Sequence, residues 1–166
     1  VMKERGIKAR THRRFKVRTT DSNLAFPVAK NVLDRKFTAA RPDQVWLTDI
    51  TYIPTDEGWL YLAGVMDLCS RRIVGWSMAE HMRVELVRDA LNMALEARRP
   101  GADLLHHSDR GVQYACDEYQ ELLASRGIRV SMSGVGDCYD NAPKESFWSK
   151  LKTELVYLDH FATRAQ

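Results

Sequence analysis

The chain has 166 residues, 45% hydrophobic and 28% charged, which excludes a disordered chain, a collagen-like repeat and a coiled-coil rod. Its net charge of +3 hides a split: residues 1–43 carry 12 Lys and Arg against 4 Asp and Glu, and residues 44–166 carry 13 against 18. The sequence shows no apolar run long enough to cross a bilayer and no export signal, so we expect one cytoplasmic domain with a basic tail and no membrane contact.

Residues 1–43 are predicted to form a basic tail followed by a linker. Residues 3–18 hold eight basic residues and one acid, and clustered Lys and Arg gain affinity for nucleic acid by releasing counterions from its phosphates. The alternative is a solvated tail without a partner. Residues 19–43 contain two prolines and indicate a linker with at most one short helix. Four basic residues of the tail are candidate DNA contacts: Arg13, Arg14, Lys16 and Arg18.

From residue 45 onward the pattern predicts a mixed sheet. Residues 45–53 are rich in β-branched and aromatic residues and indicate a strand, which short turns join to two further strands in an antiparallel meander. The remaining elements alternate between helices, which show apolar residues at helical spacing, and short strands. The expected elements are strands at 45–53, 59–68, 72–78, 103–108 and 128–132 and helices at 83–98, 115–126 and 142–157. This order predicts an α/β fold with helices on both faces of a mixed sheet.

Three carboxylates fall where this fold can bring them together. Asp49 lies in mid-strand among residues that favour burial, and a buried carboxylate is costly unless it is paired or binds a metal. Asp109 follows a buried strand directly, and Glu145 lies in the first turn of the last helix. Taken singly, each has an ordinary explanation: an ion pair, a turn cap, a helix N-terminal acid. Together they favour a site for divalent cations, which prefer oxygen ligands and, as a pair of ions, promote phosphoryl transfer.

Four motifs carry a resemblance to a known family. Three of them are residues 45–53 (VWLTDITYI), 61–76 (YLAGVMDLCSRRIVGW) and 107–114 (HSDRGVQY). The fourth lies in residues 140–154 and combines Asp-Asn-Ala at 140–142, Glu-Ser-Phe at 145–147 and Leu-Lys-Thr-Glu at 151–154. They resemble the integrase catalytic core of bacterial insertion-sequence transposases of the IS-three family, itself similar to retroviral integrases. The 35 residues between Asp109 and Glu145 are the spacing of that family's acidic triad. Asp49, Asp109 and Glu145 therefore match its DDE triad position by position.

The resemblance implies an RNase H-like fold and a DDE polynucleotidyl transferase that cleaves and joins DNA at insertion-sequence ends. It also implies two Mg²⁺ or Mn²⁺ ions and no small-molecule cofactor. The expected partners are transposon-end and target DNA and further copies of the chain in a homo-oligomer. The expected localisation is the bacterial cytoplasm, on DNA. On this basis residues 44–166 are an integrase-type core, truncated at the C-terminus relative to the family. The alternatives are an idle fragment that regulates by binding DNA or full-length transposase, and an RNase H-type nuclease.

Two lysines of the last predicted helix are candidate DNA contacts. Lys152 lies seven residues after Glu145 and shares its helix face, so it can reach a phosphate beside the metal site. Lys144 is a weaker candidate, and a solvated helix lysine is the alternative in both cases. Trp148, like the other three tryptophans, is predicted to be a core or interface aromatic.

Four further polar residues are given supporting roles. His107 and Ser108 precede Asp109 and are predicted to hold it in place, with plain packing as the alternative. Asn141 is predicted to cap the helix that carries Glu145. Asp67 is expected to structure the turn that follows the second strand.

Overall fold

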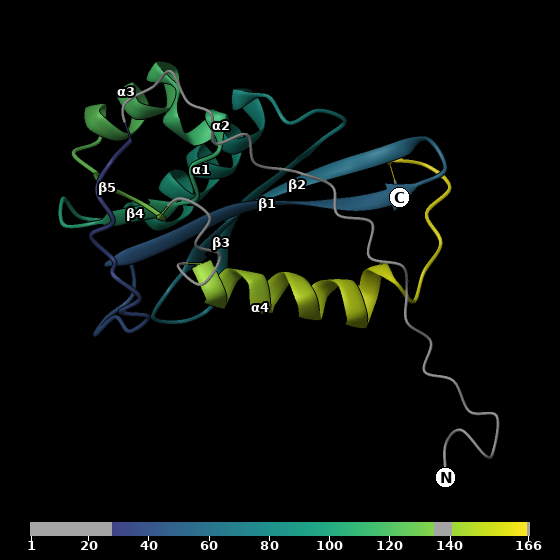
Figure 1. The fold of residues 1–166 in the computed structure, drawn as a ribbon, viewed down its shortest axis with the longest axis horizontal. Helices are drawn as coiled ribbons and strands as arrows, with labels where there is room; N and C mark the ends of the chain where they lie inside the picture. Colours follow the sequence, from purple (N-terminus) through teal and green to yellow (C-terminus); the bar gives the residue numbers. More distant parts are fainter. Residues whose placement is uncertain (1–27, 135–140, 166) are drawn as a thin grey trace, which may run out of the picture.

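The computed structural model describes residues 28–134 and 141–165, and a five-stranded mixed sheet forms its centre (Figure 1). The strand order is β3-β2-β1-β4-β5. The antiparallel meander consists of β1 (Val45–Thr55), β2 (Gly58–Asp67) and β3 (Ile73–Ala79). On the other side, β1 pairs in parallel with β4 (Leu105–Ser108), which pairs in parallel with β5 (Arg129–Met132). The predicted mixed sheet is confirmed.

The helices are α1 (Val84–Arg98), α2 (Val112–Ala115), α3 (Asp117–Ser125) and α4 (Ala142–Leu151), and α4 continues into one π-helical turn (Lys152–Val156). The helix predicted over 115–126 is present as α3, whereas the short α2 just before it was not predicted. Cys116, which is extended with φ −67° and ψ 150°, separates the two helices. In the part of the chain that the structure describes, no helix is long and apolar enough to span a bilayer.

Helices cover both faces of the sheet, as predicted (Figure 1). On one face, Trp46 and Ile50 of β1 pack into the main core with α1, α2 and α3. On the other face, Ile53 packs with Trp148 of α4. Successive side chains of a strand point to opposite faces, so Asp49 shares the α4 face with Ile53.

The described part of the linker packs against the sheet without forming a helix. Leu33 is buried against Leu47 and Leu105. The backbone N–H groups of Val32 and Leu33 both donate to the hydroxyl of Ser131, at 2.9 and 3.2 Å. The linker is therefore held by β5, the strand at one edge of the sheet.

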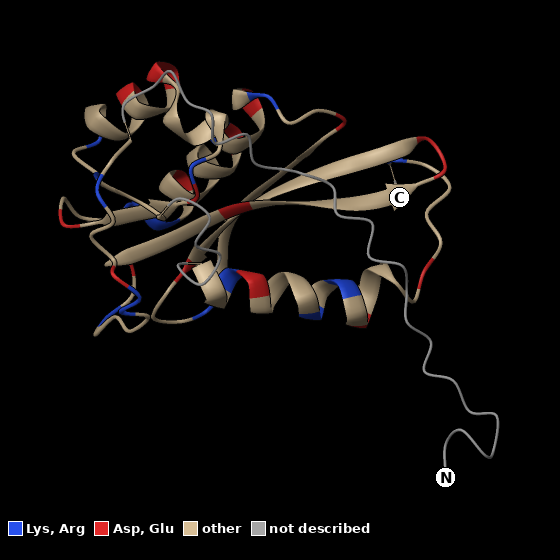
Figure 2. Cartoon of the chain, viewed as in Figure 1, with Lys and Arg blue, Asp and Glu red and all other residues tan. Residues whose placement is uncertain are grey.

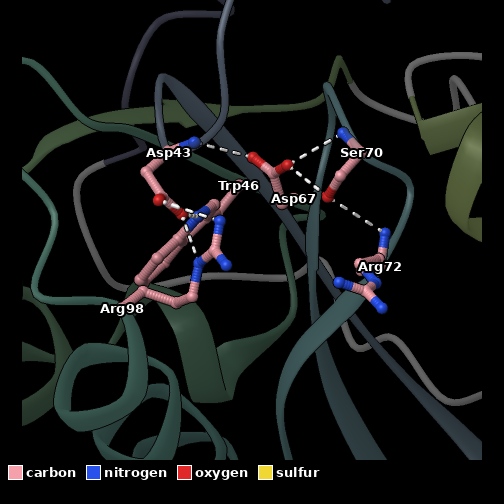
Figure 3. A network of polar contacts seen from close by, with 6 residues as sticks. All are labelled: Asp43, Trp46, Asp67, Ser70, Arg72 and Arg98. Carbon is pink, nitrogen blue, oxygen red and sulfur yellow. Dashed lines mark hydrogen bonds and ion pairs between the residues drawn. The ribbon is translucent and has the colours of Figure 1, made fainter.

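Asp67 anchors a polar network at the end of β2 (Figure 3). Its side chain is fully buried and accepts hydrogen bonds from the N–H of Asp43 at 2.9 Å and from the N–H of Ser70 at 2.8 Å. Asp43 in turn pairs with Arg98 at the end of α1 and accepts from the indole N–H of Trp46. The predicted role of Asp67 in the turn is confirmed.

The C-terminal segment closes over the β1–β2 turn. The N–H of Asp56 donates to the carbonyl of Phe161 at 3.0 Å. Arg164 donates from its backbone N–H to the Glu57 carboxylate at 2.9 Å, and its guanidinium lies 3.0 Å from Glu80.

Candidate active site

The pairing of β1 with β4 brings Asp49 and Asp109 together. The parallel register sets Leu47 beside His107. Asp49 and Asp109 each lie two residues further along the chain, and residues two apart point to the same face. The two carboxyl groups therefore meet where β4 ends, and both line one small hollow there.

Asp49 is the only charged residue of β1, and Figure 2 shows it as the acidic position within that strand. Its carboxylate accepts hydrogen bonds from the N–H of Ile50 at 2.8 Å and from the indole N–H of Trp148 at 3.0 Å. Burial and, second, the charge of Asp109 raise the pKa of Asp49, while Lys144 opposes that rise. The negative charges of Asp49 and Asp109 thus repel each other, and a bound cation would reduce that repulsion.

Asp109 lies at the opening of a small hollow. One of its oxygens accepts from the N–H of Gly111 at 2.9 Å, which fixes the turn into α2. The hollow is lined by both carboxylates together with Ile50, Gln113 and Tyr114. Burial raises the pKa of the Tyr114 phenol well above its ordinary value, so that group stays neutral beside the acids.

Glu145 does not join the two aspartates. It lies in the first turn of α4 but is exposed, and the modest rise in its pKa comes from partial burial alone. Among residues 28–134 and 141–165, no group of three or more His, Cys, Asp or Glu residues is arranged to hold a metal ion. The structure therefore brings two of the three predicted ligands together and leaves the third on the adjacent helix.

Lys144, predicted as a DNA contact, is fully buried, and this prediction is corrected here. Its Nζ lies 4.5 Å from the centre of the Trp148 ring. Burial lowers the pKa of Lys144, and the charge of Asp49 counteracts that effect. A side chain enclosed between α4 and the sheet cannot reach a phosphate in this arrangement.

Lys152 extends from the π-helical turn along the same helix. Its Nζ lies 4.1 Å from the centre of the Tyr52 ring, and the residue is partly exposed. Burial lowers the pKa of Lys152, with Asp49 again opposing the change. The ammonium group thus lies beside Tyr52 of β1, on a side chain that is partly exposed.

His107 and Ser108 are both buried behind Asp109. His107 exchanges hydrogen bonds through Nδ1 with Ser131 at 2.9 Å and through Nε2 with Ser133 at 3.2 Å. The hydroxyl of Ser108 donates to the carbonyl of Asp109 at 3.0 Å. These bonds tie the end of β4 to β5 and so fix the backbone that carries Asp109.

Asn141 occupies the N-cap position of α4, as predicted, but its side chain makes no capping bond. Its amide donates instead to the carbonyl of Thr48 at 3.3 Å, because the start of α4 lies directly on β1. The capping prediction is corrected to a contact that docks the helix beside Asp49.

The sequence alone missed Trp148 as a partner of Asp49, and Gln113 and Tyr114 as lining residues. The spacing of 141, 144 and 148 on one helix face was the available signal for the docked side of α4. The candidate contacts Arg13, Arg14, Lys16 and Arg18 lie outside the described residues.

Comparisons with known proteins agree with this architecture. Residues 39–138 match the integrase core domain family. The chain is 49% identical over 162 residues to an insertion element IS600 uncharacterized 31 kDa protein of Shigella sonnei, and 44% identical over 163 residues to the transposase InsF for insertion sequence IS3A of Escherichia coli. Each match covers 98% of this chain but only 59% and 56% of the relative, so the chain spans less than two thirds of their length.

Solved structures share the fold. The chain resembles a chain in the structure of the simian T-cell lymphotropic virus intasome in complex with PP2A regulatory subunit B56 gamma, with a TM-score of 0.65 and 18% identity over 82% of this chain and 46% of that one. It also resembles the dimeric form of the HTLV-2 integrase catalytic core domain in complex with magnesium, with a TM-score of 0.57 and 18% identity over 69% of this chain and 70% of that one. The RNase H-like fold expected from the sequence is confirmed.

Proposed function

The chain belongs to the integrase core domain family, and we propose that it is the catalytic core of a DDE transposase that cuts and joins DNA at insertion-sequence ends. The observation that carries this proposal is the meeting of Asp49 and Asp109 at the end of β4. The InsF transposase of E. coli supplies the kind of DNA to expect, the ends of an insertion sequence.

The donor set fits a divalent cation. Two carboxylates lie close enough for the charge of Asp109 to raise the pKa of Asp49, and hard cations such as Mg²⁺ or Mn²⁺ prefer such oxygens. Asp49 and Asp109 would hold the ion or ions, with Glu145 as a third ligand once α4 presents it. A bound ion of this kind stabilises the charge that develops on the phosphate and activates the attacking oxygen.

The remaining residues hold and shield the site. Trp148 and the N–H of Ile50 fix the orientation of the Asp49 carboxylate. Ser108 and the N–H of Gly111 hold the turn that carries Asp109. Such fixed positions lower the barrier by limiting the reorganisation needed during phosphoryl transfer.

We place the DNA contacts on two parts of the chain. Lys152 is partly exposed beside Tyr52 of β1 and suits a phosphate next to the site. The basic tail of residues 3–18 would grip the backbone further away, and residues 44–166 would carry the chemistry. We also propose a homo-oligomer that acts on bacterial DNA in the cytoplasm.

The test is cleavage and joining of plasmid DNA with Mg²⁺ or Mn²⁺. We expect Asp49→Asn to reduce activity by at least about 10³-fold, because an uncharged amide cannot replace a carboxylate ligand. The matched control is Asp103→Asn, which removes a carboxylate that is 88% exposed and pairs only loosely with Arg41. Full activity in Asp49→Asn would refute the assignment.

The same assay separates the two alternatives. Cleavage restricted to the RNA strand of an RNA–DNA hybrid would indicate an RNase H-type nuclease. DNA binding without cleavage or joining, in a folded chain with either ion, would indicate an idle regulatory fragment. The transposase relatives favour neither.

A further inference from the structure

Lys144 is the unusual residue of the site, because a positive side chain is enclosed beside the acids. The side chain is 0% exposed, and its Nζ has no hydrogen-bond partner among the residues that the structure describes. Its neighbours are the faces of Trp148, at 4.5 Å, and Phe147, at 5.7 Å. A buried ammonium without hydrogen bonds is costly and needs a compensating charge nearby.

That charge is Asp49. The register of β1 and β2 places Gly64 opposite Asp49, and Gly64 leaves the room that Lys144 occupies, since a Cβ there would lie 2.7 Å from Nζ. Trp148 connects the two residues, with its ring beneath Nζ and its indole N–H on the Asp49 carboxylate. Lys144 is thus the cation that balances Asp49 in this structure.

The placement of Lys144 also explains why Glu145 is exposed. Adjacent residues on an α-helix point about 100° apart, so the face that carries Asn141, Lys144 and Trp148 onto β1 turns Glu145 toward solvent. Burial of Lys144 and entry of Glu145 into the site are therefore alternatives for one helix.

Resting on the function proposed above, we propose that Lys144 is a built-in competitor of the divalent ion, and that it must leave Asp49 before the ion binds there. The competition is electrostatic, because a divalent ion bound at Asp49 and the buried ammonium group near it would repel each other strongly in a poorly solvated position. The ion would then bind more weakly than it would to the same two aspartates without the lysine charge. Its binding would also be linked to a rearrangement of α4.

The direct test is calorimetric titration with Mn²⁺ on the whole chain. Lys144→Met keeps the length of the side chain and removes its charge, and we expect it to bind Mn²⁺ about tenfold more tightly, within the usual range of coupling between two binding events. Lys150→Met makes the same change at an exposed position of α4 and should leave the affinity unchanged. Thermal unfolding without metal checks that each variant is folded, and Lys144→Gln serves if the methionine variant is not.

A second measurement follows the side chain itself. Nζ of Lys144 lies over the Trp148 ring, so the NMR signals of the adjacent methylene protons should be shifted upfield in the metal-free protein. Saturating Mg²⁺ should return them to ordinary positions. If Mg²⁺ binds and they stay upfield, the lysine has not left, and the inference is refuted.

The outcomes distinguish this inference from the proposed function. Loss of Mn²⁺ binding in Asp49→Asn with unchanged or weaker binding in Lys144→Met refutes the competition and leaves the metal site intact. Unaltered Mn²⁺ binding in Asp49→Asn refutes the metal site, and the inference falls with it. Tighter binding in Lys144→Met together with loss in Asp49→Asn supports both.

Discussion

Gly75 offers the sharpest test of how α1 is seated on the sheet. An alanine Cβ at this position of β3 would lie 2.6 Å from the backbone N of Ala94 and 2.7 Å from its Cβ, and closer still to the carbonyl oxygen of Ala90. Ordinary contact begins at 3.4 Å. The obstacle is helix backbone, which cannot move aside as a side chain tip can, so α1 as a whole must retreat by about 1 Å.

That retreat loosens the buried face of α1. Leu86, Val87 and Leu91 on its inward face are at most 2% exposed, and a gap of this size forfeits about a quarter to a half of each contact's attraction. We expect Gly75→Ala to lower the free energy of unfolding by about 3 kcal/mol, the upper end for an overpacked core. Urea denaturation at 25 °C measures this change.

Gly101→Ala is the matched control, because a Cβ there meets nothing within 4 Å. It should leave the free energy of unfolding unchanged or raise it by up to about 1 kcal/mol through the unfolded chain. A loss below about 0.5 kcal/mol in Gly75→Ala, no larger than an ordinary surface substitution, would refute the packing of α1 on β3 described above.

Two further predictions concern buried polar groups. Burial and, second, the neighbouring His107 lower the pKa of His106 to about 3. Below pH 6.5 the unfolded chain therefore binds a proton at His106 more readily than the folded chain does. The contribution of His106 to the free energy of unfolding is complete above pH 6.5 and should fall by about 2 kcal/mol from pH 7 to pH 5. Urea titrations at several pH values should show that the free energy of unfolding changes less with pH in His106→Gln than in the unmodified chain. An unchanged pH dependence would contradict the lowered pKa of His106. Ser131→Ala leaves the N–H groups of Val32 and Leu33 without their shared acceptor. The substitution should lower the free energy of unfolding by about 1–3 kcal/mol and speed proteolysis in the linker. Equal cleavage rates in the two proteins would show that Ser131 does not hold the linker.

The fold could be predicted from the sequence because the residue types within each strand and the lengths of the turns between strands indicate the same strand pairing. The meander from Val45 to Ala79 combined β-branched runs with short turns, and both signals predict antiparallel pairing. The short helix α2 was missed because four residues are too few to show a helical pattern. The side chain of Gln120 donates to the carbonyl of Tyr114 at 2.6 Å and so joins α3 to α2, a contact that sequence spacing does not reveal.

The site was predicted only in part, for a physical reason. Asp49 and Asp109 meet because strand register determines which residues are neighbours, and strands can be recognised in a sequence. The orientation of α4 depends instead on which of two adjacent residues, Lys144 or Glu145, faces the sheet. Helical spacing allows both rotations, and the choice is made by the room above Gly64 and by the charge of Asp49.

The bonds between Arg164 and Glu57 also affect the order in which the chain can fold. They join residues 107 positions apart, so a growing chain completes the β1–β2 hairpin long before its cover exists. At about 5–20 residues per second, the tip of that hairpin waits roughly 5–20 s for its partner. During synthesis the turn at residues 56–58 is therefore accessible to chaperones and proteases until the segment that carries Arg164 has emerged and packed against it.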